Sequence, residues 1–156
     1  MSTPPVRPAR PADDTRIREL QQYLREPSPA LLDPALDALS TDAASLAIGV
    51  DETWRLLVTP DNSDEPVGYL LAIEGSATHI AELVVDPAHR RQKRATALLE
   101  SVCESTRHPV TVCVAADNEA ARLVYKQLGF TEVDRRAEQF DSGDGLTLRY
   151  DPQSTQ

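Results

Sequence analysis

The chain has 156 residues, of which 40% are hydrophobic and 26% charged, and its formal net charge is -9 at pH 7. This length fits a single domain, which buries about two thirds of the surface that the unfolded chain would expose. The acidic excess argues against the broad positive face that nucleic acid requires, and no apolar run approaches the roughly 20 residues that cross a bilayer. We therefore expect a soluble globular protein without nucleic acid or membrane partners.

The N-terminal sequence MSTPPVRPARPADD has no apolar centre and does not resemble a signal peptide, so we expect a cytoplasmic protein. Cys103 and Cys113 fall on a predicted helix and a predicted strand. Each is expected to be a small buried hydrophobic residue and not half of a disulfide. The histidines share no ligand spacing with the cysteines, so we predict no metal site.

Arginine greatly outnumbers lysine, because Lys93 and Lys126 are the only lysines among 16 basic residues. Acid excess with this preference would suit a very salty cytoplasm, although many ordinary bacterial proteins are also acidic. A halophilic origin stays a hypothesis, and a sharp fall of solubility in high salt would count against it.

The two ends of the chain are polar or contain proline, and we expect flexible tails at residues 1–5 and 151–156 around one domain at 6–150. A short extended segment, VRPA, precedes the first predicted helix, in DDTRIRELQQYLRE, which follows acidic N-cap candidates. Its apolar face consists of Ile17, Leu20 and Leu24.

The next segment contains two proline pairs, Ser28-Pro29 and Asp33-Pro34, and each reads as an N-cap followed by a first helical position. Residues 28–39 are therefore predicted to be either one helix or two short turns. The following AASLAIGV, residues 43–50, fits a strand or a helix equally well.

Three strands follow, because WRLLVT, VGYLLAI and THIAELVV are separated by the turn sequences PDNSDEP and EGSA. Apolar, β-branched runs bounded by such turns are typical of an antiparallel meander.

The basic stretch HRRQKR, residues 89–94, comes between the third of these strands and an amphipathic helix. Five apolar residues recur at the spacing of a helix packed on a sheet, and Thr106 to Pro109 end that helix. These residues are Ala95, Leu98, Leu99, Val102 and Cys103. Cations at a strand-to-helix turn of an acidic protein indicate an anion site.

The last third of the chain starts with the strand VTVCVA, and Asn118 then caps a helix that Gly129 ends in the left-handed conformation. We predict that the inner face of this helix consists of Ala120, Leu123, Val124 and Leu128. Two final strands, TEVDRR and LTLRY, are joined by the loop FDSGDG.

This order of elements, together with two motifs, resembles the GNAT superfamily of acyl-coenzyme A-dependent N-acyltransferases. LVVDPAHRRQKRATALL is similar to the family's L-x-V-x-P-x-x-[RQ]-x-x-G-x-[GA] segment, and NEAARLVYKQLGF to N-x-x-A-x-x-x-Y-x-x-x-G-F. The resemblance spans nearly the whole chain and implies a mixed α/β (α+β) fold. We expect a central sheet of about seven strands with about four helices, splayed between the fourth and fifth strands.

The resemblance implies that acetyl-CoA is the cosubstrate, with its pantetheine arm along the backbone of Leu83, Val84 and Val85. The side chains of these three residues would be buried in the core whether or not the strand binds acetyl-CoA, so they do not distinguish the two possibilities. The pyrophosphate would be bound at the start of the next helix, where backbone N–H groups and the helix dipole favour an anion. The implied contacts are Arg90, at the family's [RQ] position, Arg91, Gln92, Lys93, Arg94, Ala95, Thr96 and Asn118. Alternatively, the arginines lie on a solvent-exposed face and bind no phosphate.

Lys93 stands where the family has its first glycine. If the turn needs a positive φ there, a lysine costs on the order of 1 kcal/mol and the turn binds the cosubstrate less tightly. Alternatively, its ammonium replaces a backbone contact. Ala95 conforms at the second small position.

Tyr125 matches the family's general acid, and a phenol with a pKa near 10 is protonated at neutral pH. It would protonate the departing thiolate, and the alternative is a tyrosine at the edge of an apolar stripe with its hydroxyl in water. Glu82 is the candidate base, and it would need burial or a relaying water because an ordinary glutamate is too weak a base. A solvated strand glutamate is its alternative.

Some GNAT enzymes that acetylate protein N-termini, including the N-terminal alanine type that this chain distantly resembles, carry a glutamate on the fifth strand. The matching residue here is Cys113, which argues against that subgroup.

We therefore predict an N-acetyltransferase in which a primary amine, on a small molecule or a peptide, attacks acetyl-CoA directly in a ternary complex. The oxyanion would be met by the N–H of Val84 or Val85. A catalytically silent acyl-CoA binding module and a GNAT-like interaction domain are the alternatives. The sequence leaves the acceptor open, although Asp141 and Asp144 would attract a cationic amine, and it is compatible with a monomer or a homodimer.

Overall fold

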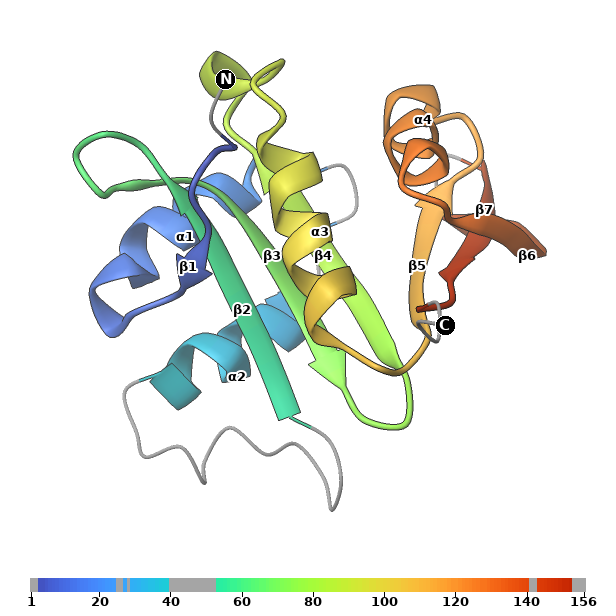
Figure 1. Ribbon diagram of the computed structural model, residues 1–156, viewed down its shortest axis with the longest axis horizontal. Coiled ribbons are helices and arrows are strands. Elements are labelled where there is room, and N and C mark those ends of the chain that lie inside the picture. The colour runs from blue at the N-terminus through green and yellow to red at the C-terminus, as the bar shows by residue number, and fades with distance from the viewer. Residues whose placement is uncertain (1–2, 25–26, 28, 40–52, 141–142, 153–156) are drawn as a thin grey trace.

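The computed structural model describes residues 3–24, 27, 29–39, 53–140 and 143–152. Its helices and strands follow one another in the predicted order (Figure 1). They are β1 (Arg7–Pro8), α1 (Asp14–Gln21), α2 (Pro29–Leu39), β2 (Thr53–Pro60), β3 (Pro66–Glu74), β4 (Thr78–Val85), α3 (Arg94–Ser105), β5 (Val110–Ala115), α4 (Glu119–Gln127), β6 (Thr131–Phe140) and β7 (Gly143–Tyr150). Within these ranges no helix is long and apolar enough to span a membrane.

All seven strands belong to one mixed sheet in the order β1-β2-β3-β4-β5-β7-β6. Neighbouring strands are antiparallel except β4 and β5, which run parallel with α3 as their connection. The predicted fold, a mixed sheet with four helices, is confirmed.

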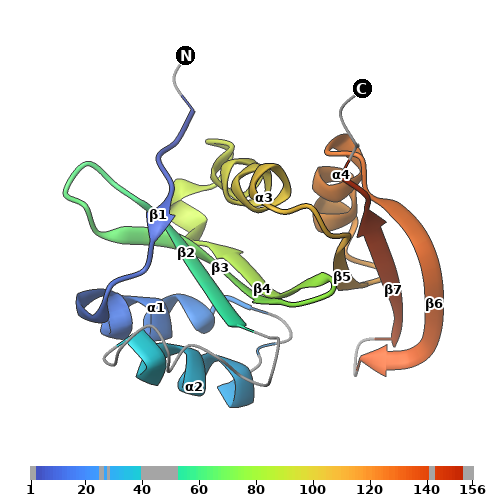
Figure 2. The same cartoon turned by 60° about the horizontal axis from the view of Figure 1, so that its bottom comes forward.

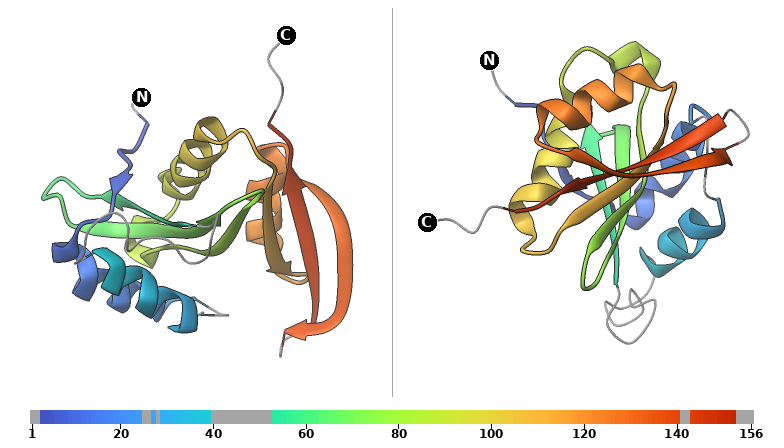
Figure 3. Two further views of the ribbon diagram at one scale, coloured as in Figure 1. Left: turned by 90° about the horizontal axis from the view of Figure 1, so that it is seen from below. Right: turned by 90° about the vertical axis from the view of Figure 1, so that its right-hand side faces the viewer.

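Helices pack on both faces of the sheet, but one face of β5, β7 and β6 has no helix in front of it in Figure 3. In Figure 2, α3 and α4 lie on one face and α1 and α2 lie on the other. The core under α3 and α4 includes Leu70, Ile80, Leu98, Val112 and Leu146, and the core under α1 and α2 includes Ile17, Leu32, Tyr69, Leu71 and Val84. Figure 3, right, shows the β5, β7 and β6 part of the sheet with no drawn helix in front of it.

The first helix buries Ile17 and Leu20 completely, as predicted, but it ends at Gln21, so the third predicted residue, Leu24, lies beyond the helix and is only partly buried. Its acidic N-cap does not act as one. The Asp13 side chain makes no capping bond to α1. It accepts hydrogen bonds from the Arg10 N–H and the Arg7 guanidinium instead, both at 2.8 Å, and so fixes the segment that precedes the helix.

The 29–39 segment is one helix and not two short turns, although Pro34 lies inside it. An internal proline removes one hydrogen bond of the helix. Burial of Leu32, Ala35 and Leu36, each at most 1% exposed, offsets that loss. The proposed cap Ser28 and the ambiguous residues 43–50 lie outside the described residues.

The predicted inner face of α4 is right for Val124 and Leu128 but wrong for Leu123, which is 55% exposed, and for Ala120, which is also exposed. Tyr125 is buried instead, and Ala121, Val124 and Leu128 pack partly against the same core. The inner stripe is rotated from the predicted one, so the tyrosine faces the core between α4 and α3.

Candidate functional site

The sheet opens between β4 and β5. These two strands pair only over Thr78–Ile80 and Val110–Val112, and in Figure 1 they diverge beyond that point. β5 stays paired with β7 along its whole length, and β4 stays paired with β3. The later residues of β4 and β5 therefore face each other across an opening without hydrogen-bonding to each other.

A β-bulge in β4 sits where the opening begins. The pairing with β3 skips Ala81, since Leu71 pairs with Glu82 while Ala72 pairs with Ile80. An extra residue of this kind bends a strand and increases its local twist. The bulge is the local reason why β4 turns away from β5.

Beyond the bulge, the direction of each backbone group follows from the ladder. The Asp86 N–H donates to the Val67 carbonyl of β3 at 2.8 Å. In an antiparallel pair, alternate residues direct both backbone groups to the same neighbour, so Val84 also faces β3. The N–H and C=O groups of Leu83 and Val85 point into the opening, whereas those of Val84 do not.

The turn between β4 and α3 has two residues in the left-handed conformation, Arg91 at φ 64° and Lys93 at φ 63°. The positive φ that the glycine position implied is therefore present, and a lysine occupies it. Lys93 is the N-cap of α3 and gives the helix no side-chain cap. The first N–H groups of α3 are thus left to an external acceptor, as helix N-termini commonly leave them.

The four cations of this turn have different environments. Arg94 anchors the turn to β2, because its guanidinium donates to the Thr59 hydroxyl at 2.9 Å and to the Pro60 carbonyl at 3.0 Å. Arg90 donates from Nε to the Val85 carbonyl at 3.0 Å, at the end of the open edge. Arg91 and Lys93 are exposed. Three of the four predicted cations are therefore placed beside the opening or in solvent, and Arg94 is structural.

Tyr125 lies on the α3 side of the opening and is 3% exposed. Its ring packs edge-on against Phe130, with centroids 5.1 Å apart. Burial raises the pKa of its phenol, with a smaller contribution from Cys103. The phenol therefore keeps its proton throughout the physiological pH range, and it is not the solvent-edge tyrosine of the alternative interpretation.

Asn118 caps α4 as predicted, because its side chain accepts a hydrogen bond from the Ala121 N–H at 3.3 Å. Gly129 has φ 102° just after the helix, which is the predicted left-handed C-cap. These two residues fix the length and direction of α4, and they thereby position Tyr125.

Glu82 is on the other face of β4, under α1, and is 3% exposed. It accepts a hydrogen bond from the Tyr69 hydroxyl at 2.8 Å and another from the Gln21 side chain at 3.0 Å. Glu82 is therefore a buried carboxylate held by donors from β3 and α1, and not a solvated strand glutamate. Burial and the charge of Glu82 raise the pKa of Tyr69, so that phenol stays a donor.

His79 is a polar residue at the opening that the sequence did not single out. Its Nδ1 lies 3.0 Å from the Thr111 hydroxyl, at the pair of β4 and β5 residues just before the last one. Burial lowers the pKa of the imidazole below its usual 6.5. Strict alternation of strand residues would have placed His79 on the face opposite Glu82; the bulge at Ala81 puts both on one face, and the pairing of β4 with β5 places Thr111 beside His79.

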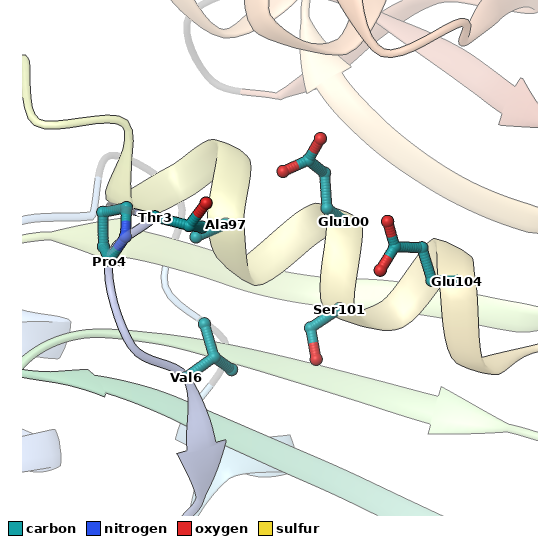
Figure 4. A pocket seen from close by; sticks show the side chains of 7 residues that line it. All are labelled: Thr3, Pro4, Val6, Ala97, Glu100, Ser101 and Glu104. Atoms are coloured by element: carbon teal, nitrogen blue, oxygen red, sulfur yellow. The ribbon is translucent and has the colours of Figure 1, made fainter. Parts of the chain in front are cut away.

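Two other features are a hollow beside α3 and the side chain of Cys113. A hollow of about 290 Å³ lies between the N-terminal segment and the flank of α3 (Figure 4), and the carboxylates of Glu100 and Glu104 on its rim make it a poor site for an anion. Cys113 is only partly buried, since it lies on the face of β5 that α4 does not cover. In the described ranges no cluster of His, Cys, Asp and Glu side chains is suited to a metal ion.

Comparison with known proteins identifies this arrangement. Residues 25–143 match the family model described as an acetyltransferase (GNAT) domain, which is most of the chain. The chain belongs to the GNAT acetyltransferase family.

Two curated relatives within the GNAT family are named mycothiol acetyltransferase. The protein from Clavibacter sepedonicus is 40% identical over 85 residues, and the one from Clavibacter michiganensis subsp. michiganensis is 35% identical over 85 residues. The aligned part is 54% of this chain but only 28% of either relative. This chain therefore matches a minor part of much longer proteins.

Solved structures of other GNAT proteins share the fold over nearly the whole chain. The ribosomal-protein-S18-alanine N-acetyltransferase of Escherichia coli superimposes with a TM-score of 0.76 at 17% identity, covering 97% of this chain and 96% of that one. Arabidopsis thaliana NAA60 in complex with acetyl-CoA gives 0.71 at 20% identity, with 95% and 98% covered. A chimera of spermidine N-acetyltransferase SpeG from Vibrio cholerae and hSSAT gives 0.74 at 20%, with 95% of each chain covered.

Proposed function

We propose that this protein is an N-acetyltransferase that moves the acetyl group of acetyl-CoA to a primary amine by direct attack in a ternary complex. One observation carries the proposal. The unpaired edge of β4 leads directly into a turn whose N–H groups and cations are available to an anion. A molecule with an amide-rich arm and a diphosphate is complementary to both features.

The pantetheine arm is proposed to bind along the opening as an additional strand would. Its amides would pair with the N–H and C=O groups of Leu83 and with the N–H of Val85, since the Val85 carbonyl already accepts a hydrogen bond from Arg90. The same reasoning favours the N–H of Leu83 or Val85 for the oxyanion of the tetrahedral intermediate, and not that of Val84, which is directed at β3. This choice corrects one of the two donors expected from the sequence.

The pyrophosphate is proposed to bind the N–H groups of the turn and of the first turn of α3, from Arg91 to Thr96. Arg91 and Lys93, both exposed, add positive charge there. Gln92 bonds Arg94 through its side chain at 2.8 Å, so both contribute to the shape of the turn more than to its charge. Asn118, the N-cap of α4, and Ala95, in the first turn of α3, would line the site.

Tyr125 is proposed to give its proton to the sulfur as the C–S bond breaks. A proton donor in this position must still be protonated at working pH, and the buried phenol meets that condition. Because no acyl-enzyme is required, Cys103 and Cys113 have no role as nucleophiles in this scheme.

The amine is proposed to approach from the other face of the sheet, where Glu82 supplies a negative charge that favours an ammonium. The hydrogen bonds from Tyr69 and Gln21 hold this carboxylate in place. Asp144 is a weaker attractor than its sequence position implied, because it bonds the Arg135 side chain and the Glu138 N–H. Asp141 lies outside the described residues.

The names of the relatives guide the choice of acceptors for a test. A panel would contain a peptide with an N-terminal alanine, spermidine and the unacetylated amine precursor of mycothiol. Acetyl-CoA binding would be measured by calorimetry, and thiol release would be followed with each amine. Binding together with amine-dependent thiol release supports the proposal.

The same experiment separates the alternatives. Micromolar binding of acetyl-CoA without consumption by any amine would favour a silent acyl-CoA module. No binding at all would favour an interaction domain on a GNAT scaffold. Both results contradict the proposed enzyme.

A further inference from the structure

His79 occupies a distinctive point of the sheet, at the vertex of the opening. It pairs with Thr111 one position before the β4–β5 ladder ends at Ile80 and Val112. Ile80 belongs to the core under α3, and side chains alternate along a strand, so His79 faces the opposite side. On β5, Thr111 faces that side too, because Val110 and Val112 are in the α3 core.

This face of β5, β7 and β6 is the one that no drawn helix covers in Figure 3. The residues paired across the sheet in the row of His79 are Trp54 on β2, Ile73 on β3, Thr111 on β5, Arg149 on β7 and Thr131 on β6. Glu82 on β4 and Cys113 on β5 lie just beyond this row. Among the charged members, Arg149 bonds Asp151 at 2.9 Å and Glu82 bonds Tyr69 and Gln21. His79 and Cys113 are both partly buried and both lie beside a neutral hydroxyl, Thr111 and Thr147 respectively, but the imidazole has a second ring nitrogen that can exchange a proton.

The position of His79 relative to the thioester follows from the proposed binding of the pantetheine arm. With the diphosphate at the start of α3, the arm runs from Val85 back along the opening towards Ile80. Five strand residues span about 17 Å, so the acetyl end of the arm lies near the vertex. There Tyr125 is on the α3 side and His79 is on the opposite side, so the leaving sulfur and the incoming nitrogen have separate proton-handling groups.

We propose that His79 is the group that removes the proton from the attacking ammonium. This inference rests on the proposed acetyl transfer. In the tautomer that carries its proton on Nδ1, His79 donates to the Thr111 hydroxyl, and the lone pair of Nε2 is then left to accept a proton. The imidazole is neutral at physiological pH because burial disfavours its charged form.

The protons and electron pairs balance as follows. An N–H proton of the ammonium passes to Nε2, and the freed lone pair forms the C–N bond to the thioester carbon. The C–S bond breaks with its electron pair going to sulfur, which takes the proton of Tyr125. The second N–H proton, lost from nitrogen as the amide forms, restores the phenol, and the imidazolium returns its proton to solvent.

Glu82 is less suited to this step, although it was the candidate base from the sequence. It is 3% exposed and lies under α1, and its two oxygens accept hydrogen bonds from Tyr69 and Gln21. Both carboxylate oxygens are thus already engaged as hydrogen-bond acceptors, and the group lies away from solvent. Glu82 therefore contributes charge, and His79 exchanges the proton.

The test compares His79→Gln with native protein and with His108→Gln, a matched change of the exposed histidine before β5. The acceptor is whichever amine of the panel the native protein acetylates. We expect His79→Gln to lower kcat/KM by about 100-fold, with the dissociation constant of acetyl-CoA unchanged. His108→Gln is expected to behave as the native protein. His79→Asn is the second variant if the glutamine does not fold.

The pH profile distinguishes proton removal from a purely structural role. In the native protein, kcat/KM should fall only as pH drops below 6.5, where His79 becomes protonated. Without the imidazole, the amine must lose its proton in solution, so the rate should rise about tenfold per pH unit up to the amine's own pKa. Thr111→Val should give a smaller loss, because it removes only the partner of Nδ1.

An unchanged rate and pH profile in His79→Gln would overturn the assignment while leaving acetyl transfer intact. Loss of acetyl-CoA binding together with activity in both His79 variants would also overturn it, because that result indicates a structural clip between β4 and β5. A native protein that binds acetyl-CoA and acetylates no amine would remove the proposed function itself, and the inference with it.

Discussion

At the scale of single residues, Tyr125 tests the chemistry most directly, because one oxygen atom distinguishes it from phenylalanine. Removing the hydroxyl leaves the ring packed against Phe130, so acetyl-CoA binding should persist. Turnover should fall by about 100-fold if the phenol protonates the thiolate. Thiol release under saturating acetyl-CoA, with binding measured by calorimetry, checks both parts.

Tyr150→Phe is the matched control for Tyr125→Phe. Tyr150 also packs against Phe130, with ring centroids 5.5 Å apart. Its variant should retain native turnover. Equal turnover in Tyr125→Phe and the native protein would exclude Tyr125 from the mechanism.

Tyr69→Phe should lower the free energy of unfolding by about 1–3 kcal/mol, because it removes a donor from the buried carboxylate of Glu82. Tyr69 is fully buried, so water cannot readily replace its hydroxyl. Chemical denaturation at neutral pH measures the loss. Tyr23→Phe, at a tyrosine 46% exposed, is the control, and equal stability of the two variants would contradict the view that Tyr69 supports Glu82.

Several site residues could be placed from sequence alone, and the reason is local. Asn118, Gly129 and Tyr125 lie within one helix and its two ends, where spacing fixes geometry. The role of Arg94 could not be read in this way, since its partners Thr59 and Pro60 are more than thirty positions away in the chain. Such long-range partners depend on how β2 meets α3.

At the scale of elements, the turn before α3 holds Lys93 in a conformation that favours glycine, at φ 63° and ψ 25°. Comparing Lys93→Gly with Lys93→Ala isolates the backbone, because both variants lose the ammonium. The glycine variant should have the higher free energy of unfolding, by about 1 kcal/mol. Chemical denaturation of the two variants gives this difference directly.

Acetyl-CoA binding by the same pair separates the two interpretations of Lys93. If both variants bind more weakly than the native protein by the same factor, the ammonium contributes to the phosphate site. If only the glycine variant binds as tightly as the native protein or better, the backbone conformation decides. Equal stability of the two variants would mean that the left-handed residue carries no strain.

Helices and strands could be predicted where the spacing of apolar residues was regular. The predictions failed where packing selects between two similar faces of a helix. In α4, Leu123 and Tyr125 were both compatible with the inner face by spacing, and the aromatic contact with Phe130 selects Tyr125. In α2, the sequence could not show that burial of Leu32 and Leu36 offsets Pro34. Neither preference is encoded within a single turn of helix.

At the scale of the whole molecule, the order of strands and the opening between β4 and β5 followed from two motifs and the sequence of elements. The uncovered face of β5, β7 and β6 did not, because a strand pattern says which side chains alternate but not which helix covers them. That face brings His79 and Thr111 together from different strands. The candidate site can therefore be predicted only in part from the sequence, because some of its residues meet only through the pairing of distant strands.

The link between α1 and the end of β4 gives a prediction for the pH dependence of stability. Arg16 on α1 bonds Asp86 at 2.7 Å, and the Ala88 N–H donates to the same carboxylate at 2.8 Å. The Ala88 N–H first, and Arg16 second, lower the pKa of Asp86 below its usual 3.8. A carboxylate whose pKa is lowered by folding stabilises the protein above its unfolded pKa and loses that effect as pH falls through the folded value.

Asp86→Asn should therefore lower the free energy of unfolding by about 1–2 kcal/mol at pH 7, and the difference from the native protein should vanish as pH falls below 3.8. Denaturation midpoints across this range measure it. Asp151→Asn breaks a pair that is 43% and 62% exposed and should change stability little at any pH. If the two proteins instead differed in free energy of unfolding by the same amount down to pH 2, the loss would come from disturbed packing around the amide. The contact between Arg16 and the charged Asp86 would then not stabilise the link between α1 and the end of β4.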